Sequence, residues 1–266
     1  MSLTADDLAA AGLHFDVSDG VVATVTLSRP DKRNAQTPAM WHALGAIGEQ
    51  IPESVRVVVV RGAGHSFSAG LDRAMLDPAT GDVARLLHES DEAISAAIDG
   101  YQRGFTWLRD PAFVSVAAVQ GYAIGAGFQL ALSCDLRVLA DDAQLCMKEP
   151  ALGLVPDLTG TKPLVEAVGY QRALEICATT RMVPATEAVE IGLALAAVPA
   201  DRLEATVADL VQALTGPMAG AVRDTKRLLQ SAAEQDLETQ RRLEREAQIL
   251  RFRELAALLQ PETSQE

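Results

Sequence analysis

A buried-type strand followed by a glycine-rich turn constrains the fold of this chain more than any other feature. An apolar run spans Phe113 to Val119, and Gly121, Gly125 and Gly127 precede a run of helix-forming residues. Glycine lets the backbone turn sharply where a strand gives way to a helix. The first amides of a helix have no intrahelical partner and favour negative charge, so this turn predicts a site where a bound ligand becomes anionic.

The first part of the chain predicts a strand, a helix and a second strand. The β-rich segment Val21 to Ser28 ends before Pro30, which cannot continue a strand ladder. Thr37 followed by proline is typical of a capped helix start, and this helix is expected to run toward Gln50. The valine-rich segment Val55 to Val60 predicts a strand covered on both faces. This order favours an α/β fold with right-handed crossover connections.

The second half predicts one more strand and then mostly helices. The strand is expected at Leu136 to Ala140, and a loop with two glycines and a proline at Ala151 to Gly160. Helices are expected at Gln171 to Thr179, Ala185 to Gly192, Asp201 to Leu214, Met218 to Ala233 and Leu237 to Leu259. The sequence therefore predicts an α/β core over residues 1–200 and a helical region over residues 201–266.

Composition excludes several classes of protein. The chain has 266 residues and a formal net charge of −13, which disfavours nonspecific binding to nucleic acid. Its three cysteines lack the paired spacing of a disulfide framework or a zinc site, and none of its four histidines has metal-ligand spacing. An acidic start without an apolar core, and no apolar run of membrane-spanning length, indicate a cytoplasmic protein that does not bind membranes.

Two separated motifs resemble the signatures of the crotonase, or enoyl-CoA hydratase/isomerase, family. The first is Ser66-Phe-Ser-Ala-Gly-Leu-Asp72, and the second is Gly121-Tyr-Ala-Ile-Gly-Ala-Gly-Phe-Gln-Leu-Ala-Leu-Ser-Cys-Asp135. The similarity extends from about Phe15 to about Val198. Their order and spacing are far more specific than a single glycine-rich loop.

This resemblance implies a crotonase-like fold of repeated ββα units with a C-terminal helical region used in trimerisation. It also implies an acyl-CoA thioester substrate, a homotrimer or dimer of trimers, and no separate cofactor or metal, because coenzyme A is part of the substrate. The implied oxyanion hole consists of the backbone amides of Leu71 and Ala126. The residues that the resemblance assigns to CoA binding are Lys32, Arg33, Ala35 and Ala69.

The family's hydratases use two glutamates, and this sequence keeps one of them. The matching positions hold Gln129 and Glu149. Glutamine cannot take up a proton at neutral pH, whereas hydration needs both activation of water and delivery of a proton to the α-carbon. One carboxylate suffices for isomerisation: Glu149 would remove a proton from C2 of a 3-enoyl-CoA and return it to C4. The residues therefore favour a single-glutamate isomerase linked to fatty acid metabolism.

Two other functions remain open. One is a hydratase in which Gln129 positions water for Glu149, and the other is a weakly catalytic acyl-CoA-binding protein.

Several of these residues also have plain structural interpretations. Without the resemblance to the family, Glu149 would be interpreted as an ordinary surface carboxylate. Gln129 could equally be a pocket-lining residue without a catalytic role. Asp72 is expected to fix the loop after Leu71, and Asp157 to be a turn residue. Cys134 is expected to serve packing, because no histidine that could activate it is near in sequence.

Overall fold

A computed structural model describes residues 4–259 of the chain, so the outer ends of both predicted regions, residues 1–3 and 260–266, lie outside it. Its larger sheet has six strands in the order β1-β2-β3-β4-β6-β9, of which only β1 and β2 pair in antiparallel fashion. These strands are β1 (Leu13–Ser18), β2 (Val22–Leu27), β3 (Val57–Gly62), β4 (Val114–Val119), β6 (Leu136–Ala140) and β9 (Ala196–Val198). The α/β class predicted from the sequence is confirmed.

A second, three-stranded sheet carries the glycine-rich turn. It consists of β5 (Tyr122–Ile124), β7 (Gln144–Cys146) and β8 (Val183–Pro184). Strands β5 and β7 pair in parallel, and β7 and β8 are antiparallel. The parallel pairing matters for the site, because it aligns the segments that follow β5 and β7 at the same edge.

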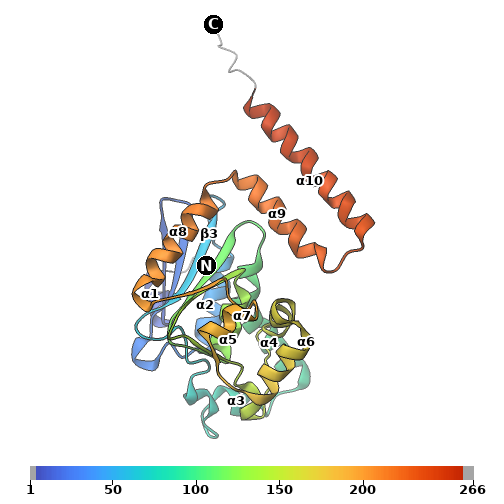
Figure 1. The fold of residues 1–266 in the computed structure, drawn as a ribbon. Helices are drawn as coiled ribbons and strands as arrows, with labels where there is room; N and C mark the ends of the chain where they lie inside the picture. The colour runs from blue at the N-terminus through green and yellow to red at the C-terminus, as the bar shows by residue number, and fades with distance from the viewer. Residues whose placement is uncertain (1–3, 260–266) are drawn as a thin grey trace.

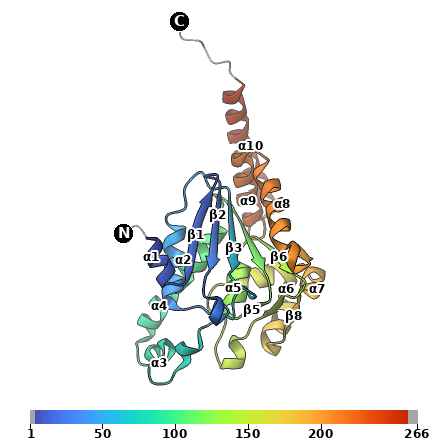
Figure 2. The ribbon, with the colours of Figure 1, turned by 90° about the vertical axis from the view of Figure 1, so that its left-hand side faces the viewer.

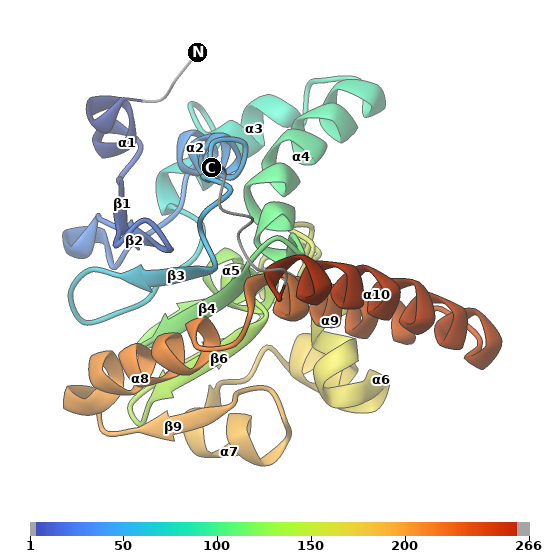
Figure 3. The same ribbon diagram turned by 90° about the horizontal axis from the view of Figure 1, so that it is seen from above.

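Helices cover both faces of the larger sheet (Figures 1 and 3). They are α1 (Ala5–Ala10), α2 (Pro38–Gly48), α3 (Asp82–Leu86), α4 (Asp91–Thr106), α5 (Ala126–Ser133), α6 (Thr161–Thr179), α7 (Ala185–Glu190), α8 (Leu203–Thr215), α9 (Ala219–Ala232) and α10 (Leu237–Leu258). Short 3₁₀ turns occur at η1 (Pro30–Lys32), η2 (Arg73–Leu76), η3 (Trp107–Arg109), η4 (Glu149–Leu152) and η5 (Ala200–Arg202).

The alternation of valines in β3 explains the two layers of helices. Val58 and Val60 belong to the main apolar cluster, which also holds the buried faces of α2, α4 and α5. Val57 and Val59 point to the other face, where Leu203 and other residues of α8 pack against them. Successive side chains of a strand point to opposite faces, so an all-valine strand is apolar on both.

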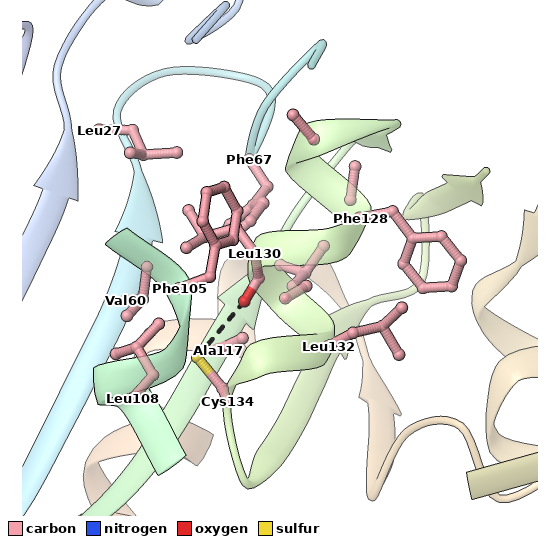
Figure 4. Packing of buried hydrophobic residues seen from close by; sticks show 14 of the residues in the cluster. Leu27, Val60, Phe67, Phe105, Leu108, Ala117, Phe128, Leu130, Leu132 and Cys134 are labelled. Atoms are coloured by element: carbon pink, nitrogen blue, oxygen red, sulfur yellow. Dashed lines mark hydrogen bonds between the residues drawn. The ribbon is translucent and has the colours of Figure 1, made fainter. Parts of the chain in front are cut away.

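Helix α5 is buried along its whole length, which fixes the residues it presents to the site. Every residue from Ala126 to Ser133 is buried. Figure 4 shows Phe128, Leu130 and Leu132 of this helix within the packed core, with the Cys134 thiol near the carbonyl oxygen of Leu130 at 3.8 Å. A helix packed on all sides has no freedom to shift relative to the sheet.

Most of the elements expected from the sequence are present, with shifted limits. The strand expected at Val55 to Val60 is β3, two residues later, and the helix expected from Gln171 begins at Thr161. A break at Gly169, with a positive φ of 75°, obscures the helical pattern of α6 in the sequence. Strand β1 was not predicted from the sequence.

The C-terminal helices leave the body of the molecule after α8. Helices α9 and α10 run side by side, and α10 extends away from the sheet (Figures 1 and 2). Lys226 of α9 holds this arm to the core, since its Nζ donates to the carbonyl oxygens of Asp110 and Phe113 and to the Asp135 carboxylate at 2.6–2.7 Å. Helix α10 has no buried residue. No helix within residues 4–259 is long and apolar enough to cross a membrane.

Candidate active site

Two turns from distant parts of the chain lie against each other at the edge of β5. The Ser68 amide donates to the carbonyl oxygen of Tyr122 at 2.8 Å, and the Ile124 amide donates to the carbonyl oxygen of Ser68 at 3.0 Å. Gly70 has a φ of 83°, and a Cβ there would lie 2.3 Å from the carbonyl oxygen of Ile124. Only glycine fits this close approach. The two sequence motifs therefore form one structure.

The Leu71 and Ala126 amides are hydrogen-bond donors of these turns that have no partner within residues 4–259. A Cβ on Gly70 would lie 3.5 Å from the Ala126 nitrogen, so the two turns approach each other here. Ala126 is the first residue of α5, where helix amides lack an intrahelical partner. Within residues 4–259, neither amide has a hydrogen-bond acceptor. Both N–H groups are therefore available to donate to a ligand.

Glu149 lies beside this turn because β7 pairs with β5. The Gly125 amide donates to the carbonyl oxygen of Cys146 at 2.8 Å, and η4 begins three residues later. A Cβ on Gly125 would lie 3.2 Å from Glu149 Oε1 and 3.6 Å from Oε2. Glu149 is only 9% exposed, whereas Lys148 points into solvent. The interpretation of Glu149 as a surface carboxylate is therefore wrong.

Gln129 meets Glu149 in the interior. It lies one turn into α5, is fully buried, and its Nε2 donates to Glu149 Oε1 at 2.6 Å. Its Oε1 accepts from the amides of Leu158 at 2.9 Å and Gly160 at 3.2 Å. Glu149 Oε2 is buried and has no hydrogen-bond partner in the described part of the chain. The structure thus joins the two residues that the sequence placed at the candidate reaction centre.

The surroundings of Glu149 raise its proton affinity. Burial is the main cause that raises the pKa of the Glu149 carboxyl, and the negative charge of Asp157 adds to it. The hydrogen bond from Gln129 opposes this shift by favouring the anion. A carboxylate with a raised pKa is a stronger base when ionised, as a residue that removes a carbon-bound proton must be.

Asp157 is a further titratable residue near Glu149. It is half-buried, and burial raises the pKa of its carboxyl. Its backbone carbonyl accepts from Gln102 Nε2 at 2.7 Å, which ties this loop to α4. The interpretation of Asp157 as a turn residue misses its burial and its electrostatic effect on Glu149. Nothing in the spacing of a Gly- and Pro-containing loop signals which side chain turns inward.

The residues assigned to CoA binding lie on the Leu71 side of the site. Lys32 and Arg33 are exposed, and the Arg33 guanidinium lies 5.7 Å from the ring centre of Tyr122. The Ala69 amide donates to the carbonyl oxygen of Arg33 at 2.8 Å, so this loop is continuous with the turn that holds Leu71. Ala35 is buried. No hydrogen bond or ion pair within residues 4–259 connects these four residues to Glu149 or Gln129.

Asn34 holds this loop in place, a role that was not recognised in the sequence. It is fully buried, and its Nδ2 donates to the carbonyl oxygens of Ala63 and Ser66 at 2.9 and 2.8 Å. Asp72 accepts from Arg29 Nη2 at 2.8 Å and from the Ala74 amide at 3.1 Å, so it fixes the loop as expected. These contacts hold the chain on both sides of Leu71.

The Cys134 thiol belongs to the hydrophobic core. Cys134 is buried, and burial raises the pKa of its thiol to about 12, which suits packing and not nucleophilic attack. In the part of the chain that the structure describes, no cluster of three or more His, Cys, Asp or Glu side chains could hold a metal ion.

Comparison with known proteins finds relatives whose names describe acyl-CoA enzymes. Residues 18–255 match the model of the enoyl-CoA hydratase/isomerase family. The chain is 30% identical over 236 residues to a protein of Bacillus subtilis named as a proposed enoyl-CoA hydratase/isomerase, covering 88% of this chain and 87% of that one. It is 34% identical to the mitochondrial Delta(3,5)-Delta(2,4)-dienoyl-CoA isomerase of Rattus norvegicus, covering 65% of this chain and 54% of that protein.

Solved structures agree with the predicted fold. A proposed enoyl-CoA hydratase from Thermobifida fusca YX, solved in complex with CoA, superposes with a TM-score of 0.91. It is 52% identical, and the match covers 97% of this chain and 99% of that one. The crotonase-like fold is thereby confirmed.

Proposed function

This chain is an enzyme that belongs to the enoyl-CoA hydratase/isomerase family, and we propose that it moves the double bond of a 3-enoyl-CoA to the 2-position. The observation that carries the proposal is the 2.6 Å hydrogen bond between Gln129 Nε2 and Glu149 Oε1, with Oε2 left unpartnered. A single base with one oxygen that makes no hydrogen bond suits a reaction in which one proton leaves and returns.

The proposed reaction uses Glu149 for both proton transfers. Glu149 Oε2 removes a proton from C2, and the electron pair moves into a dienolate whose oxygen accepts hydrogen bonds from the Leu71 and Ala126 amides. The protonated Glu149 then returns the proton to C4, which leaves a double bond between C2 and C3. The reaction conserves all atoms and needs no cofactor. Preorganised amides stabilise the dienolate because they point at the charge before it develops.

The hydratase alternative finds less support in the contacts of Gln129. Two backbone amides occupy its oxygen, and Glu149 takes one of its two amide hydrogens. One hydrogen remains, which can donate to a water but cannot activate it, because activation requires an acceptor for its proton.

A direct test is incubation of the purified enzyme with 3-enoyl-CoA and, separately, with 2-enoyl-CoA thioesters. We expect the 3-enoyl substrate to give the conjugated thioester, measured by its ultraviolet absorbance, and little 3-hydroxyacyl-CoA to form, measured by mass spectrometry. Rapid water addition to 2-enoyl-CoA would instead establish the hydratase. Tight binding without turnover of either thioester would establish an acyl-CoA-binding protein.

Asp157 supports a second candidate, the isomerisation of 3,5-dienoyl-CoA to 2,4-dienoyl-CoA. That reaction removes a proton from C2 and adds one at C6, four bonds away, so two acid–base groups serve it better than one. Asp157 is the carboxyl whose charge acts on Glu149, so it is the candidate acid at C6 while Glu149 accepts the proton from C2. The similarity to a protein named as a dienoyl-CoA isomerase agrees with this candidate.

Asp157→Asn separates the two candidates. If Asp157 donates at C6, the variant should lose about 10²- to 10⁴-fold in kcat on a 3,5-dienoyl-CoA and keep its rate on a 3-enoyl-CoA. Steady-state rates on both substrates provide the measurement, and Asp209→Asn, an exposed site on α8, provides the control. Equal rates of wild type and variant on the dienoyl substrate would remove Asp157 from the mechanism.

We also propose that Lys32, Arg33, Ala35 and Ala69 bind the CoA moiety, and that the chain assembles as a homotrimer or dimer of trimers. The similar T. fusca structure contains CoA. Lys32 and Arg33 give this acidic protein a local positive site for phosphates. Helix α10 exposes Leu237, Ile249, Leu250, Phe252 and Leu258. Apolar side chains exposed along a helix support self-association of the region 201–266, next to the core over residues 1–200.

A further inference from the structure

The amide group of Gln129 is held in a single orientation. The backbone N–H groups of Leu158 and Gly160 can only donate hydrogen bonds, so the group that faces them must be the Gln129 oxygen. The amide nitrogen therefore faces Glu149 and donates to Oε1. The assignment of oxygen and nitrogen follows from these contacts, because the flipped amide would oppose two donors to its own NH₂ group.

This contact makes the two oxygens of Glu149 unequal. Oε1 accepts a short hydrogen bond, whereas Oε2 is buried and unpartnered within residues 4–259. We infer that Gln129 is a positioning residue: it holds Glu149 by Oε1 so that Oε2 transfers the proton, and it favours isomerisation over hydration by withholding a second base. This inference rests on the proposed function, and it adds that Gln129 sets the orientation of the Glu149 carboxylate.

Gly160 completes the support of Gln129. A Cβ at this position would lie 2.7 Å from Gln129 Cγ and 3.1 Å from its Oε1. The backbone of Gly160 has a φ of −71°, which any residue can adopt. Glycine is therefore required at position 160 because a Cβ would collide with the side chain of Gln129, and not because of the backbone conformation. Such close enclosure is expected around a side chain that positions another group.

A glutamate at position 129 would repel the ionised Glu149 carboxylate, whereas the Gln129 amide stabilises it. One of its oxygens would accept from Leu158 and Gly160, which would keep the other facing Glu149 Oε1 at hydrogen-bond distance. Two ionised carboxylates at such a distance repel, so the pair retains a shared proton and one of its pKa values rises strongly. Glutamine gives the same shape without the second charge, and Glu149 stays available as a base.

The experiment compares Gln129→Met and Gln129→Glu with the wild type. For Gln129→Met we expect kcat on 3-enoyl-CoA to fall by about 10- to 100-fold with KM changed little, because the base loses its orientation. The acid limb of the pH profile should also move to higher pH, since the lost N–H donor had favoured the anion. Gln129→Glu should show a larger shift in the same direction.

Infrared difference spectroscopy separates this inference from the proposed function. The carboxyl band of Glu149, identified by its loss in Glu149→Gln, reports protonation whether or not the enzyme turns over. We expect Glu149 to titrate at higher pH in both variants than in the wild type. If the wild type does not isomerise 3-enoyl-CoA but Glu149 titrates at higher pH in the variants, the proposed function is overturned and the positioning role of Gln129 is kept.

The matched control is Gln230→Met, which removes a half-buried amide that donates to the carbonyl oxygen of Arg109 far from the site. It should leave kcat, the acid limb and the Glu149 band unchanged. If Gln129→Met fails to fold, Gln129→Glu and Gly160→Ala test the same contact. An unchanged acid limb and an unchanged Glu149 titration in the folded variants would overturn the inference.

Discussion

Glu149→Gln is expected to lower kcat/KM for 3-enoyl-CoA isomerisation by about 10²- to 10⁴-fold, the usual contribution of a general base. The substitution keeps the size of the side chain and an oxygen that can accept the hydrogen bond from Gln129 Nε2. Only the ability to take up a proton is removed. Because Glu149 carries both transfers in the proposed reaction, no other group would replace it.

Steady-state kinetics and CoA binding together check this expectation. Binding of a CoA thioester by calorimetry should persist, since the Leu71 and Ala126 amides are unchanged. Glu49→Gln, at an exposed position next to α2, should behave as the wild type. A variant at position 149 that retains more than about a tenth of the wild-type rate would exclude general-base catalysis by Glu149.

The wild-type pH profile follows from the same residue. The reaction needs ionised Glu149, so kcat/KM should fall as the pH drops through its pKa. Burial raises that pKa, which places the acid limb above the range of an exposed glutamate.

Gly127→Ala is expected to reduce kcat by about 10²- to 10³-fold, as the loss of one oxyanion donor does. Gly127 lies inside α5, where alanine is normally better than glycine by roughly 0.5–1 kcal/mol. Here a Cβ would lie 2.6 Å from the carbonyl oxygen of Ser68 and 2.7 Å from its Cβ. The added methyl group must push the turn that holds Leu71 away from Ala126.

Ser68 has little freedom to yield to that methyl group. Its Oγ donates to the carbonyl oxygen of Asn34 at 2.8 Å and accepts from Gln36 Nε2 at 3.1 Å. Overpacking of this kind costs about 1–3 kcal/mol, so a lower unfolding temperature should accompany the loss of rate.

Gly45→Ala in α2 provides the matched control, because its nearest contact would be an ordinary 3.5 Å. That variant should keep the wild-type rate and gain up to about 1 kcal/mol in the free energy of unfolding. Wild-type activity in Gly127→Ala would show that the two turns do not need to touch.

The sequence by itself determined the α/β class, most of the helices and strands, and the two motifs that form the site. These features follow from local patterns: valines repeat along β3, and Thr37 and Pro38 mark the start of α2. Through its resemblance to the family, the sequence also predicted Glu149 and Gln129 as the candidate catalytic residues. The sequence could not show whether either side chain is buried or how its surroundings change the pKa of Glu149, because no local pattern reports burial.

Only the tertiary structure decided how Gln129 and Glu149 contact each other. The contacts of Gln129 reach residues 20, 29 and 31 positions away, and they exist because β5 pairs with β7 and the loop before α6 packs onto α5. The same folding buries Glu149, brings Asp157 close enough for its charge to act on Glu149, and inserts Lys226 into the core. Proton affinity depends on the groups that surround a carboxyl in space, and those come together only when the chain has folded.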